Sequence, residues 1–291
     1  MGIATLRCGN TPLVRGHKTW IMGILNVTPD SFSDGGDFYD TQAAIAHGLE
    51  LAANGADIID VGGVSTAPNA KSVSAEQEHQ RVIPVIKGLN GKGITAISID
   101  TTRADVALAA LEAGASWIND QSAGLFDPDM PSAMAKADGV VIMHNGGGVA
   151  SGVLAGESVF YADIIDTLRK FFHRRLEELE KSLVDPRKII VDPGVGFGKG
   201  LRDSIIIINN MHRLAEGLSL SLIGLSRKSF IGKMTAIIDP KARDFASLGA
   251  HAAAIFSGAN IIRTHNVKGT REMAMVLDGI LATGRNHENI Y

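Results

Sequence analysis

The chain has 291 residues, 45% of them hydrophobic, and a formal net charge of −3 at pH 7. The hydrophobic content is enough for a large core, whereas the charge argues against a nucleic-acid surface, which needs Lys and Arg clustered on a basic domain. Cys8 is the only cysteine, so no intramolecular disulfide forms and a reducing compartment is expected. No apolar stretch reaches the ~18 residues of a membrane span and no signal-peptide core is present, so we expect a cytoplasmic protein.

Short runs rich in Ile and Val alternate with helical segments along the chain. The expected strands are Trp20–Val27, Ile58–Gly62, Ile94–Ile99, Trp117–Asn119, Val140–Met143, Ile189–Val191, Leu220–Leu225 and Asn260–Thr264. The expected helices are Thr41–Ala56, Ser74–Leu89, Arg103–Ala113, Pro131–Ala137, Tyr161–Leu183, Ser204–Leu218, Ala246–Gly258 and Thr270–Thr283. This unbroken alternation predicts one α/β domain over residues 1–291, a (β/α)8 TIM barrel with long loops after its first and second strands.

Each expected strand ends at a polar side chain able to do chemistry. These positions are Asn26, Asp60, Asp100, Asn119, His144, Asp192, Ser226–Lys228 and Arg263–His265. In barrels of this type the active site lies at the carboxyl ends of the strands. Because burying an unpaired charge is costly, such a ring indicates a ligand site rather than core packing.

The loop after the first expected strand is too long for a simple connector. Residues 26–36 hold five hydroxyl or carboxyl groups together with Pro29 and two glycines. Connections in such folds usually have about two to six residues. The composition therefore favours a loop that faces a ligand.

Asp100, Asn119 and Asp192 are expected to form a clamp for a nitrogen-rich heterocycle such as a pterin or a purine. A carboxylate accepts two parallel N–H bonds from an amino-pyrimidine edge, and an amide both donates and accepts. Asp60 is expected to converge on the same axis, but no metal-binding spacing accompanies these carboxylates. Asp120 fits a different role, as a cap for the following helix.

Two further segments predict the rest of the ligand site. Residues 192–199 read DPGVGFGK, which is not the dinucleotide-binding fingerprint. Their glycines are expected to let the backbone approach a flat ligand, with Phe197 against it. Ser226–Lys228 and Arg263–His265 concentrate positive charge where barrels often bind phosphate, which favours an anion such as diphosphate. The alternative is simple ion pairing with neighbouring carboxylates.

Charged and histidine residues inside the expected helices have plainer interpretations. Mixed charges predict a solvated face on the longest helix, at Arg174, Arg175, Glu177, Glu178, Glu180 and Lys181. Five helical histidines have no second ligand at a metal-binding spacing: His47, His79, His173, His212 and His251. We expect these histidines to be surface or packing residues.

Seven motifs together resemble those of the dihydropteroate synthases. They are GILNVTPDSFSDGG (23–36), IDVGG (59–63), SIDT (98–101), IND (118–120), DPGVGFGK (192–199), GLSRK (224–228) and RTH (263–265). They occur in family order and span nearly the whole chain. The resemblance implies a transferase of folate biosynthesis that condenses 6-hydroxymethyl-7,8-dihydropterin diphosphate with p-aminobenzoate and releases diphosphate.

The resemblance also implies roles for single residues. The pterin would be held by Asp100, Asn119, Met143, Asp192, Phe197 and Lys228, of which Lys228, Asp100 and Asp192 would be catalytic. The diphosphate would be bound by Asn26, Thr66, Arg263 and His265, with the cofactor Mg²⁺ on Asn26. The p-aminobenzoate site, where sulfonamides compete, would be lined by Phe32, Thr66, Pro68 and Ser226. The expected partners are the small-molecule substrates and a second copy of the chain, with no nucleic acid and no membrane.

The chemistry of the implied reaction fits this distribution of residues. Breaking the pterin C–O bond leaves positive charge on the methylene carbon and extra negative charge on diphosphate, so cations are needed on the diphosphate side. The amine of p-aminobenzoate attacks without a strong base. We therefore expect no covalent adduct between the pterin and the protein.

The sequence departs from the family pattern in three places. Residues 62–70 read GGVSTAPNA where the family usually has GGESTRPGA, so Ala67 replaces an arginine and Lys71 is the substitute we expect. Losing a charge-assisted hydrogen bond weakens binding by roughly tenfold to a hundredfold. Asn145-Gly146-Gly147-Gly148 after His144, and Asp203-Ser204, also depart from the family pattern.

Two other functions remain as alternatives at this point. One is a pterin-binding paralogue with weak or no synthase activity, which the altered second loop suggests. The other is a protein similar to methyltetrahydrofolate:corrinoid methyltransferases. That class does not need Asn26, Lys228, Arg263 and His265 together, so their joint presence favours the synthase.

Overall fold

Eight parallel strands close into a barrel in the computed structural model, which describes residues 6–8, 11–13, 18–28, 37–64, 73–94, 96–146, 159–218 and 220–287. The strands are β3 (Trp20–Asn26), β4 (Ile58–Gly62), β5 (Ile97–Asp100), β6 (Trp117–Asp120), β7 (Gly139–Met143), β8 (Ile189–Asp192), β9 (Leu220–Gly224) and β10 (Ile261–Thr264). Their order around the barrel is β10-β3-β4-β5-β6-β7-β8-β9, and every neighbouring pair is parallel. The predicted (β/α)8 barrel is confirmed.

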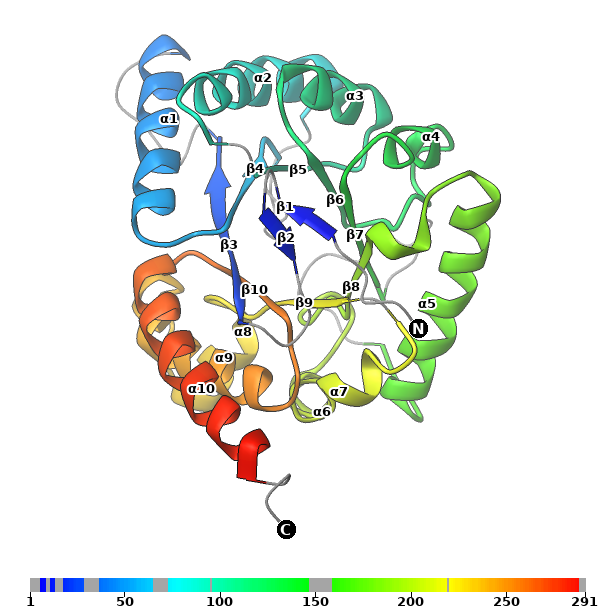
Figure 1. Ribbon diagram of the computed structural model, residues 1–291, viewed down its shortest axis with the longest axis vertical. Coiled ribbons are helices and arrows are strands. Elements are labelled where there is room, and N and C mark those ends of the chain that lie inside the picture. The colour runs from blue at the N-terminus through cyan, green and yellow to red at the C-terminus, as the bar shows by residue number, and fades with distance from the viewer. Residues whose placement is uncertain are drawn as a thin grey trace.

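Helices surround the barrel on all sides (Figure 1). They are α1 (Asp37–Ala53), α2 (Ala75–Gly91), α3 (Ala104–Ala113), α4 (Met130–Met134), α5 (Ile164–Lys181), α6 (Leu201–Asn209), α7 (Met211–Leu214), α8 (Ser229–Thr235), α9 (Asp244–Phe256) and α10 (Val267–His287), with 3₁₀ turns at Pro186–Lys188 and Lys241–Arg243. In the part of the chain that the structure describes, none of these helices has the length and apolar content needed to cross a bilayer.

The strands are buried on both faces, as parallel strands between two layers require. Side chains that point outward, such as Ile21 and Ile59, pack against the helices in the larger core. Side chains that point inward, such as Met22 and Trp117, fill the amino-terminal half of the barrel in a second core. The carboxyl ends of the strands are thus left for polar residues.

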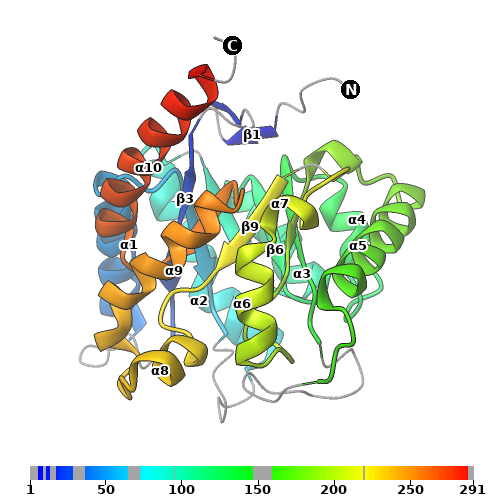
Figure 2. The ribbon, with the colours of Figure 1, turned by 90° about the horizontal axis from the view of Figure 1, so that it is seen from below.

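A β-hairpin covers the amino-terminal end of the barrel (Figures 1 and 2). It consists of β1 (Leu6–Cys8) and β2 (Thr11–Leu13), and its side chains Leu6 and Leu13 are buried in the inner core. The indole Nε1 of Trp117 donates a hydrogen bond to the carbonyl of Arg7 at 2.9 Å. This hairpin was not predicted from the sequence, because three-residue strands carry too little periodicity. The hairpin lies at the end of the barrel opposite to α8 (Figure 2).

The prediction of one helix over Ser204–Leu218 was wrong, because the structure divides it into α6 and α7. Asn210 separates them with φ −128° and ψ 27°, which is outside the helical region. The amides of Met211 and His212 donate instead to the hydroxyl and the carbonyl of Ser257, at 3.1 and 2.7 Å. These bonds tie the break to the end of α9, so its cause is tertiary.

The prediction of a fully solvated charged face on α5 was wrong for Arg175. Only 7% of its side chain is exposed, whereas 66% of the Arg174 side chain is exposed. Its Nε donates to the carbonyl of Ala123 at 3.0 Å, and its Nη1 pairs with Glu178. Arg175 therefore anchors α5 to the turn that follows β6. His251 is buried and is a packing residue, as expected, whereas His47, His79, His173 and His212 are not buried.

Asp120 caps a turn rather than the following helix. Its Oδ1 accepts the amide of Ser122 at 2.7 Å, and its Oδ2 accepts the amide of Gly124 at 2.6 Å. Helix α4 begins only at Met130. The expected role as a structural cap therefore holds, but its target is the turn 121–124.

Candidate active site

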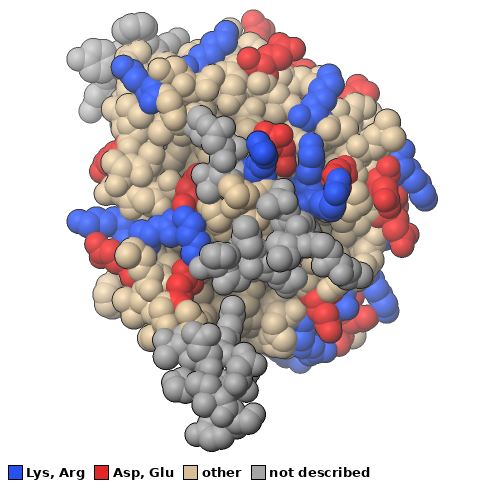
Figure 3. Space-filling model, viewed as in Figure 1, with Lys and Arg blue, Asp and Glu red and all other residues tan. Residues whose placement is uncertain are grey.

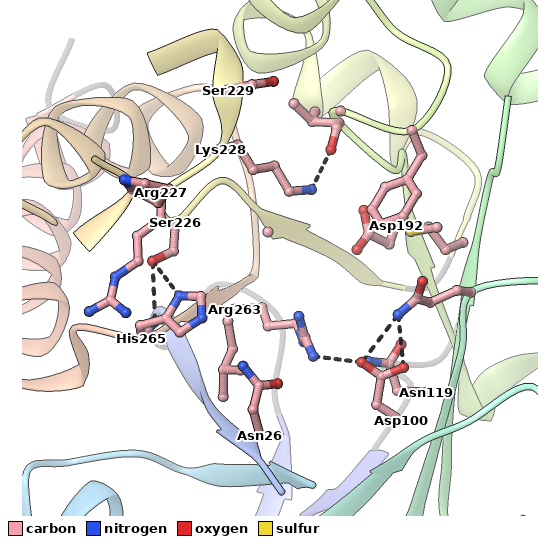
Figure 4. Close-up of a pocket in the computed structure, with 18 of the residues that line it drawn as sticks. Asn26, Asp100, Asn119, Asp192, Ser226, Arg227, Lys228, Ser229, Arg263 and His265 are labelled. Carbon is pink, nitrogen blue, oxygen red and sulfur yellow. Dashed lines mark hydrogen bonds and ion pairs between the residues drawn. The ribbon is translucent and has the colours of Figure 1, made fainter. Parts of the chain in front are cut away.

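A cavity of about 520 Å³ lies at the carboxyl ends of the barrel strands (Figure 4). Ten residues named from the sequence line it: Asn26, Asp100, Asn119, Met143, Asp192, Phe197, Ser226, Lys228, Arg263 and His265. They come from six strands and from the segments after β8, β9 and β10. The fold thus gathers side chains that are far apart in the sequence at one mouth.

Other sequence predictions lie outside the described residues. They are Phe32, Thr66 and Pro68 of the p-aminobenzoate site, Ala67 and Lys71 of the altered loop, and most of the two long loops. The cavity is also lined by residues that were not assigned to the site from the sequence, among them Thr28, Val64, Gln121 and Lys241. Gln121 carries no strand signal, because it lies in the turn 121–124 that follows β6.

Asp100 ends β5 and is held by donors from two sides. Arg263 Nη2 lies 2.7 Å from its Oδ2, and Gln121 Nε2 lies 3.0 Å from its Oδ1. Burial raises the pKa of Asp100 to about 7; Arg263 opposes this shift and the neighbouring carboxylate of Asp60 adds to it. Asp100 is therefore close to its titration point at neutral pH.

Asp60 points into the barrel from β4 but does not line the cavity. Its Oδ2 accepts hydrogen bonds from Arg263 Nε at 2.6 Å and from Asn119 Nδ2 at 3.0 Å. Burial by itself would lower the pKa of Arg263, but the carboxylates of Asp60 and Asp100 raise it. The guanidinium is thus charged and paired with both carboxylates, as in the ion-pair alternative considered from the sequence.

Asp192 and Lys228 face each other across the cavity. Asp192 Oδ1 accepts the amide of Gly194 at 2.8 Å, and Lys228 Nζ donates to the carbonyl of Val195. Burial raises the pKa of Asp192, against the charge of Lys228. Burial also lowers the pKa of Lys228 to about 8, against the charge of Asp192. The lysine ammonium lies 5.1 Å from the centroid of the Phe197 ring, over which it makes a cation–π contact.

Two of the three glycines in the DPGVGFGK segment lie against the protein backbone, whereas we expected the glycines to face the ligand. A Cβ on Gly194 would lie 2.3 Å from the carbonyl oxygen of His144, and a Cβ on Gly198 would lie 2.8 Å from the Cα of Gly146. Both glycines are left-handed and let this segment pack against the backbone after β7. Of the three glycines in the pattern, only Gly196 lines the cavity.

Lys199 joins the same two segments through its side chain. Its Nζ donates to the carbonyls of His144 and Phe197, at 2.8 and 2.7 Å. Burial lowers the pKa of Lys199 to about 7, against the charge of Asp192. Since this lysine does not line the cavity, it braces the loop that carries Phe197.

The segments after β9 and β10 form the basic wall of the cavity. Arg227 is left-handed, with φ 63°, and its guanidinium pairs with both carboxylate oxygens of Asp244 at 2.6 and 2.7 Å. Ser226 Oγ lies 3.0 Å from His265 Nδ1. Burial lowers the pKa of His265 to about 3, and Arg227 and Arg263 add to the shift. The imidazole is therefore neutral at pH 7 and has one N–H to donate to an anion.

Oxygen donors near Asn26 suit a magnesium ion that binds together with a phosphorylated ligand. Within the described ranges, no three His, Cys, Asp or Glu side chains gather as metal ligands. A Cβ on Gly62 would lie 3.9 Å from both Asn26 Oδ1 and Asp100 Oδ2, so an amide and a carboxylate oxygen both lie near Gly62. Mg²⁺ commonly takes one or two protein oxygens and completes its shell with water and substrate phosphates.

Comparisons with known proteins agree with this arrangement. The family model described as "Pterin binding enzyme" matches residues 22–265. The dihydropteroate synthase of Synechocystis sp. is 39% identical over 277 residues, 94% of each chain. A folate synthesis bifunctional protein of Arabidopsis thaliana is 37% identical over 278 residues, which are 91% of this chain and 57% of the Arabidopsis protein. The structure of Xanthomonas albilineans dihydropteroate synthase with 4-aminobenzoic acid has a TM-score of 0.86 and 38% identity, covering 95% of this chain and 98% of that one. The chain therefore belongs to the pterin-binding enzyme family, among its dihydropteroate synthases.

Proposed function

We propose that the protein condenses 6-hydroxymethyl-7,8-dihydropterin diphosphate with p-aminobenzoate to form 7,8-dihydropteroate and diphosphate. One observation carries this proposal: hydrogen-bond acceptors for a heterocycle and cations for an anion line the same cavity (Figure 4). The similarity to the synthase that binds 4-aminobenzoic acid supports the choice of the second substrate.

Acceptors on β5, β6 and β8 recognise the pterin. The carboxylates of Asp100 and Asp192 and the amide of Asn119 come from three strand ends and face the cavity. The amino-pyrimidine edge of a pterin presents N–H groups, which suit these acceptors. Met143 and Phe197 supply the apolar surface against the flat ring.

The basic wall stabilises the leaving group. When the C–O bond at the pterin methylene breaks, its electron pair leaves with the diphosphate, and Lys228 and Arg263 balance the new negative charge. Neutral His265 contributes an N–H to the same anion. The amine nitrogen of p-aminobenzoate then forms the new C–N bond and releases a proton, with no covalent bond to the protein.

We further propose that Mg²⁺ accompanies the diphosphate at Asn26. The amide oxygen of Asn26 supports this, because it lies near Gly62 at the carboxyl end of β4, and Asn26 lines the cavity. Bound in this position, the ion would supply positive charge to the diphosphate oxygens.

The test is a turnover assay with both substrates, which follows diphosphate release and identifies the product by mass spectrometry. We expect equal amounts of diphosphate and 7,8-dihydropteroate, no pterinyl adduct on the protein, and loss of turnover with EDTA that excess Mg²⁺ restores. Binding of pterin diphosphate without turnover would instead support the paralogue. Methyl transfer from methyltetrahydrofolate to a corrinoid would support the methyltransferase.

We also propose that the protein is a cytoplasmic homodimer inhibited by sulfonamides, which would compete with p-aminobenzoate. An apolar groove of about 350 Å³ between α6, α8 and α9 supports the dimer, since the exposed side chains Ile205 and Met234 line it. Light scattering should give twice the mass of one chain, and Met234→Asp should lower the measured mass. A monomeric wild-type protein would contradict the dimer.

On the face seen in Figure 3, acidic and basic side chains are interspersed, which does not suit a nucleic-acid partner.

A further inference from the structure

Asp60 contacts two residues of the cavity without lining it. It is fully buried, and β4 places it beside Ile24 of β3 and Ser98 of β5. Its Oδ2 accepts both from the amide of Asn119 and from the guanidinium of Arg263. It therefore joins the acceptor half of the cavity to the basic half.

The contact with Asn119 decides which end of that amide faces the ligand. An amide presents an oxygen acceptor and a nitrogen donor of nearly the same shape, so its partners set the orientation. Asp60 Oδ2 already accepts from Arg263 Nε, and Asn119 turns its Nδ2 toward the same oxygen, at a distance of 3.0 Å. The amide oxygen is then left for the N–H groups of a pterin.

The contact with Arg263 decides where its guanidinium lies. Asp60 accepts from Nε at 2.6 Å, and Asp100 accepts from Nη2 at 2.7 Å. A ligand can displace Asp100 from this pair because Asp100 lines the cavity. It does not reach Asp60, which is fully buried. Asp60 thus holds Nε of Arg263, while Nη2 of Arg263 can exchange Asp100 for a ligand.

We propose that Asp60 is a positioning residue that sets the hydrogen-bond pattern of the active site. It orients Asn119 as an acceptor for the pterin and holds Arg263 at the mouth for the anion, and it touches neither substrate. The inference rests on the proposed function for the identity of the ligands.

A charge-conserving exchange of the pair tests the proposal. Asn119→Asp places a second carboxylate against Asp60, whereas the double variant Asp60→Asn, Asn119→Asp restores one donor and one acceptor. In the double variant, the new amide donates to the new carboxylate, which keeps an oxygen toward the cavity. Arg263 Nε loses its acceptor, because it shared Oδ2 of Asp60 with Asn119, so the rescue is partial. Each protein is titrated calorimetrically with 6-hydroxymethyl-7,8-dihydropterin, which lacks the diphosphate, and KM and kcat are measured separately.

We expect Asn119→Asp to weaken pterin binding by at least about tenfold and the double variant to bind at least about threefold more tightly than Asn119→Asp. Most of the loss should appear in KM for the pterin diphosphate rather than in KM for p-aminobenzoate. A double variant that binds no better than Asn119→Asp overturns the role of Asp60. Asp60→Ala, if it folds, must also weaken pterin binding; unchanged affinity in this variant overturns the proposal as well.

Asp57→Asn is the matched control. Asp57 precedes β4 at the opposite end of the barrel, where its carboxylate pairs with Arg271 and Lys18. Asp57→Asn should lower the melting temperature but leave pterin affinity unchanged. If Asp57→Asn and Asp60→Ala lost pterin affinity equally, the effect of Asp60 would be merely structural. Wild-type turnover separately decides the proposed function. A wild-type protein that turns over while the exchange fails to rescue binding contradicts only the role of Asp60.

Discussion

Asp100 connects the pH dependence of the site to particular contacts. Burial raises its pKa to about 7, and the hydrogen bond from Gln121 is one of the contacts that oppose the rise. The proposed acceptor role needs the ionised carboxylate, which forms as the pH rises through the pKa. Activity should therefore fall as the pH drops below about 7.

Gln121→Leu should move the acidic limb of the pH–activity profile, the fall in activity below about pH 7, to higher pH. The variant removes the donor to Asp100, so the pKa of the carboxyl group rises and a higher pH is needed to ionise it. The measurement is kcat/KM for the pterin diphosphate from about pH 5.5 to about pH 8.5. Gln80→Leu, at an exposed position on α2, is the control and should leave the limb in place. A limb that stays put or moves to lower pH in Gln121→Leu would contradict the expectation.

At the scale of single elements, Arg175 fixes the position of α5 against the turn after β6. The variant Arg175→Ala would leave the buried carbonyl of Ala123 without its donor. An unsatisfied buried acceptor costs about 1–3 kcal/mol, so we expect the free energy of unfolding to fall by about that amount. Urea unfolding followed by circular dichroism measures the change.

Arg174 supplies the matched control for this prediction on the same helix. Its side chain is 66% exposed and its nearest carboxylate oxygen, on Glu178, lies 3.8 Å away. Arg174→Ala should change the free energy of unfolding by less than about 0.5 kcal/mol. Equal losses for the two variants would show that the contact with Ala123 does not stabilise the fold.

The elements themselves were predictable to different degrees. The eight barrel strands and most helices follow from local hydrophobic patterns, because each strand is an apolar run that ends in polar residues. The hairpin β1–β2 and the break at Asn210 do not, because they depend on the barrel end and on Ser257, which lie far away in the sequence. A helix boundary set by a distant hydroxyl leaves no mark on the local periodicity.

At the scale of the whole molecule, buried histidines couple stability to pH. Burial lowers the pKa of His251 from its ordinary value of 6.5 to about 4 in the folded protein. The unfolded chain therefore binds a proton between these values and the folded one does not, so stability falls as the pH drops from about 6.5 to about 4. His144 and His265, with pKa values lowered by burial to about 3, act in the same direction.

His251→Leu should remove part of this dependence. Each pKa unit corresponds to about 1.4 kcal/mol, so His251 accounts for a loss of about 3 kcal/mol on going from pH 6.5 to pH 4. The free energy of unfolding is measured at both pH values, and the variant should lose less than wild type by about this amount. His79→Leu, at an exposed position, is the control and should lose as much as wild type. An equal loss in His251→Leu would contradict the assignment.

The sequence by itself determined the barrel, the family and the ring of site residues. These features are local, since the strand pattern repeats along the chain and each motif is contiguous at the end of one strand. The barrel then brings every strand end to the same mouth, which is why ten predicted residues line one cavity.

Only the tertiary structure decided how these residues are paired. The contacts of Asp60 with Asn119 and Arg263, the burial of Arg175 and the packing of Gly194 against His144 join segments that are distant in the sequence. Hydrogen-bond partners and burial depend on where the chain returns in space. The sequence therefore predicted which side chains meet, and the fold decided which of them line the cavity and which of them contact other residues instead.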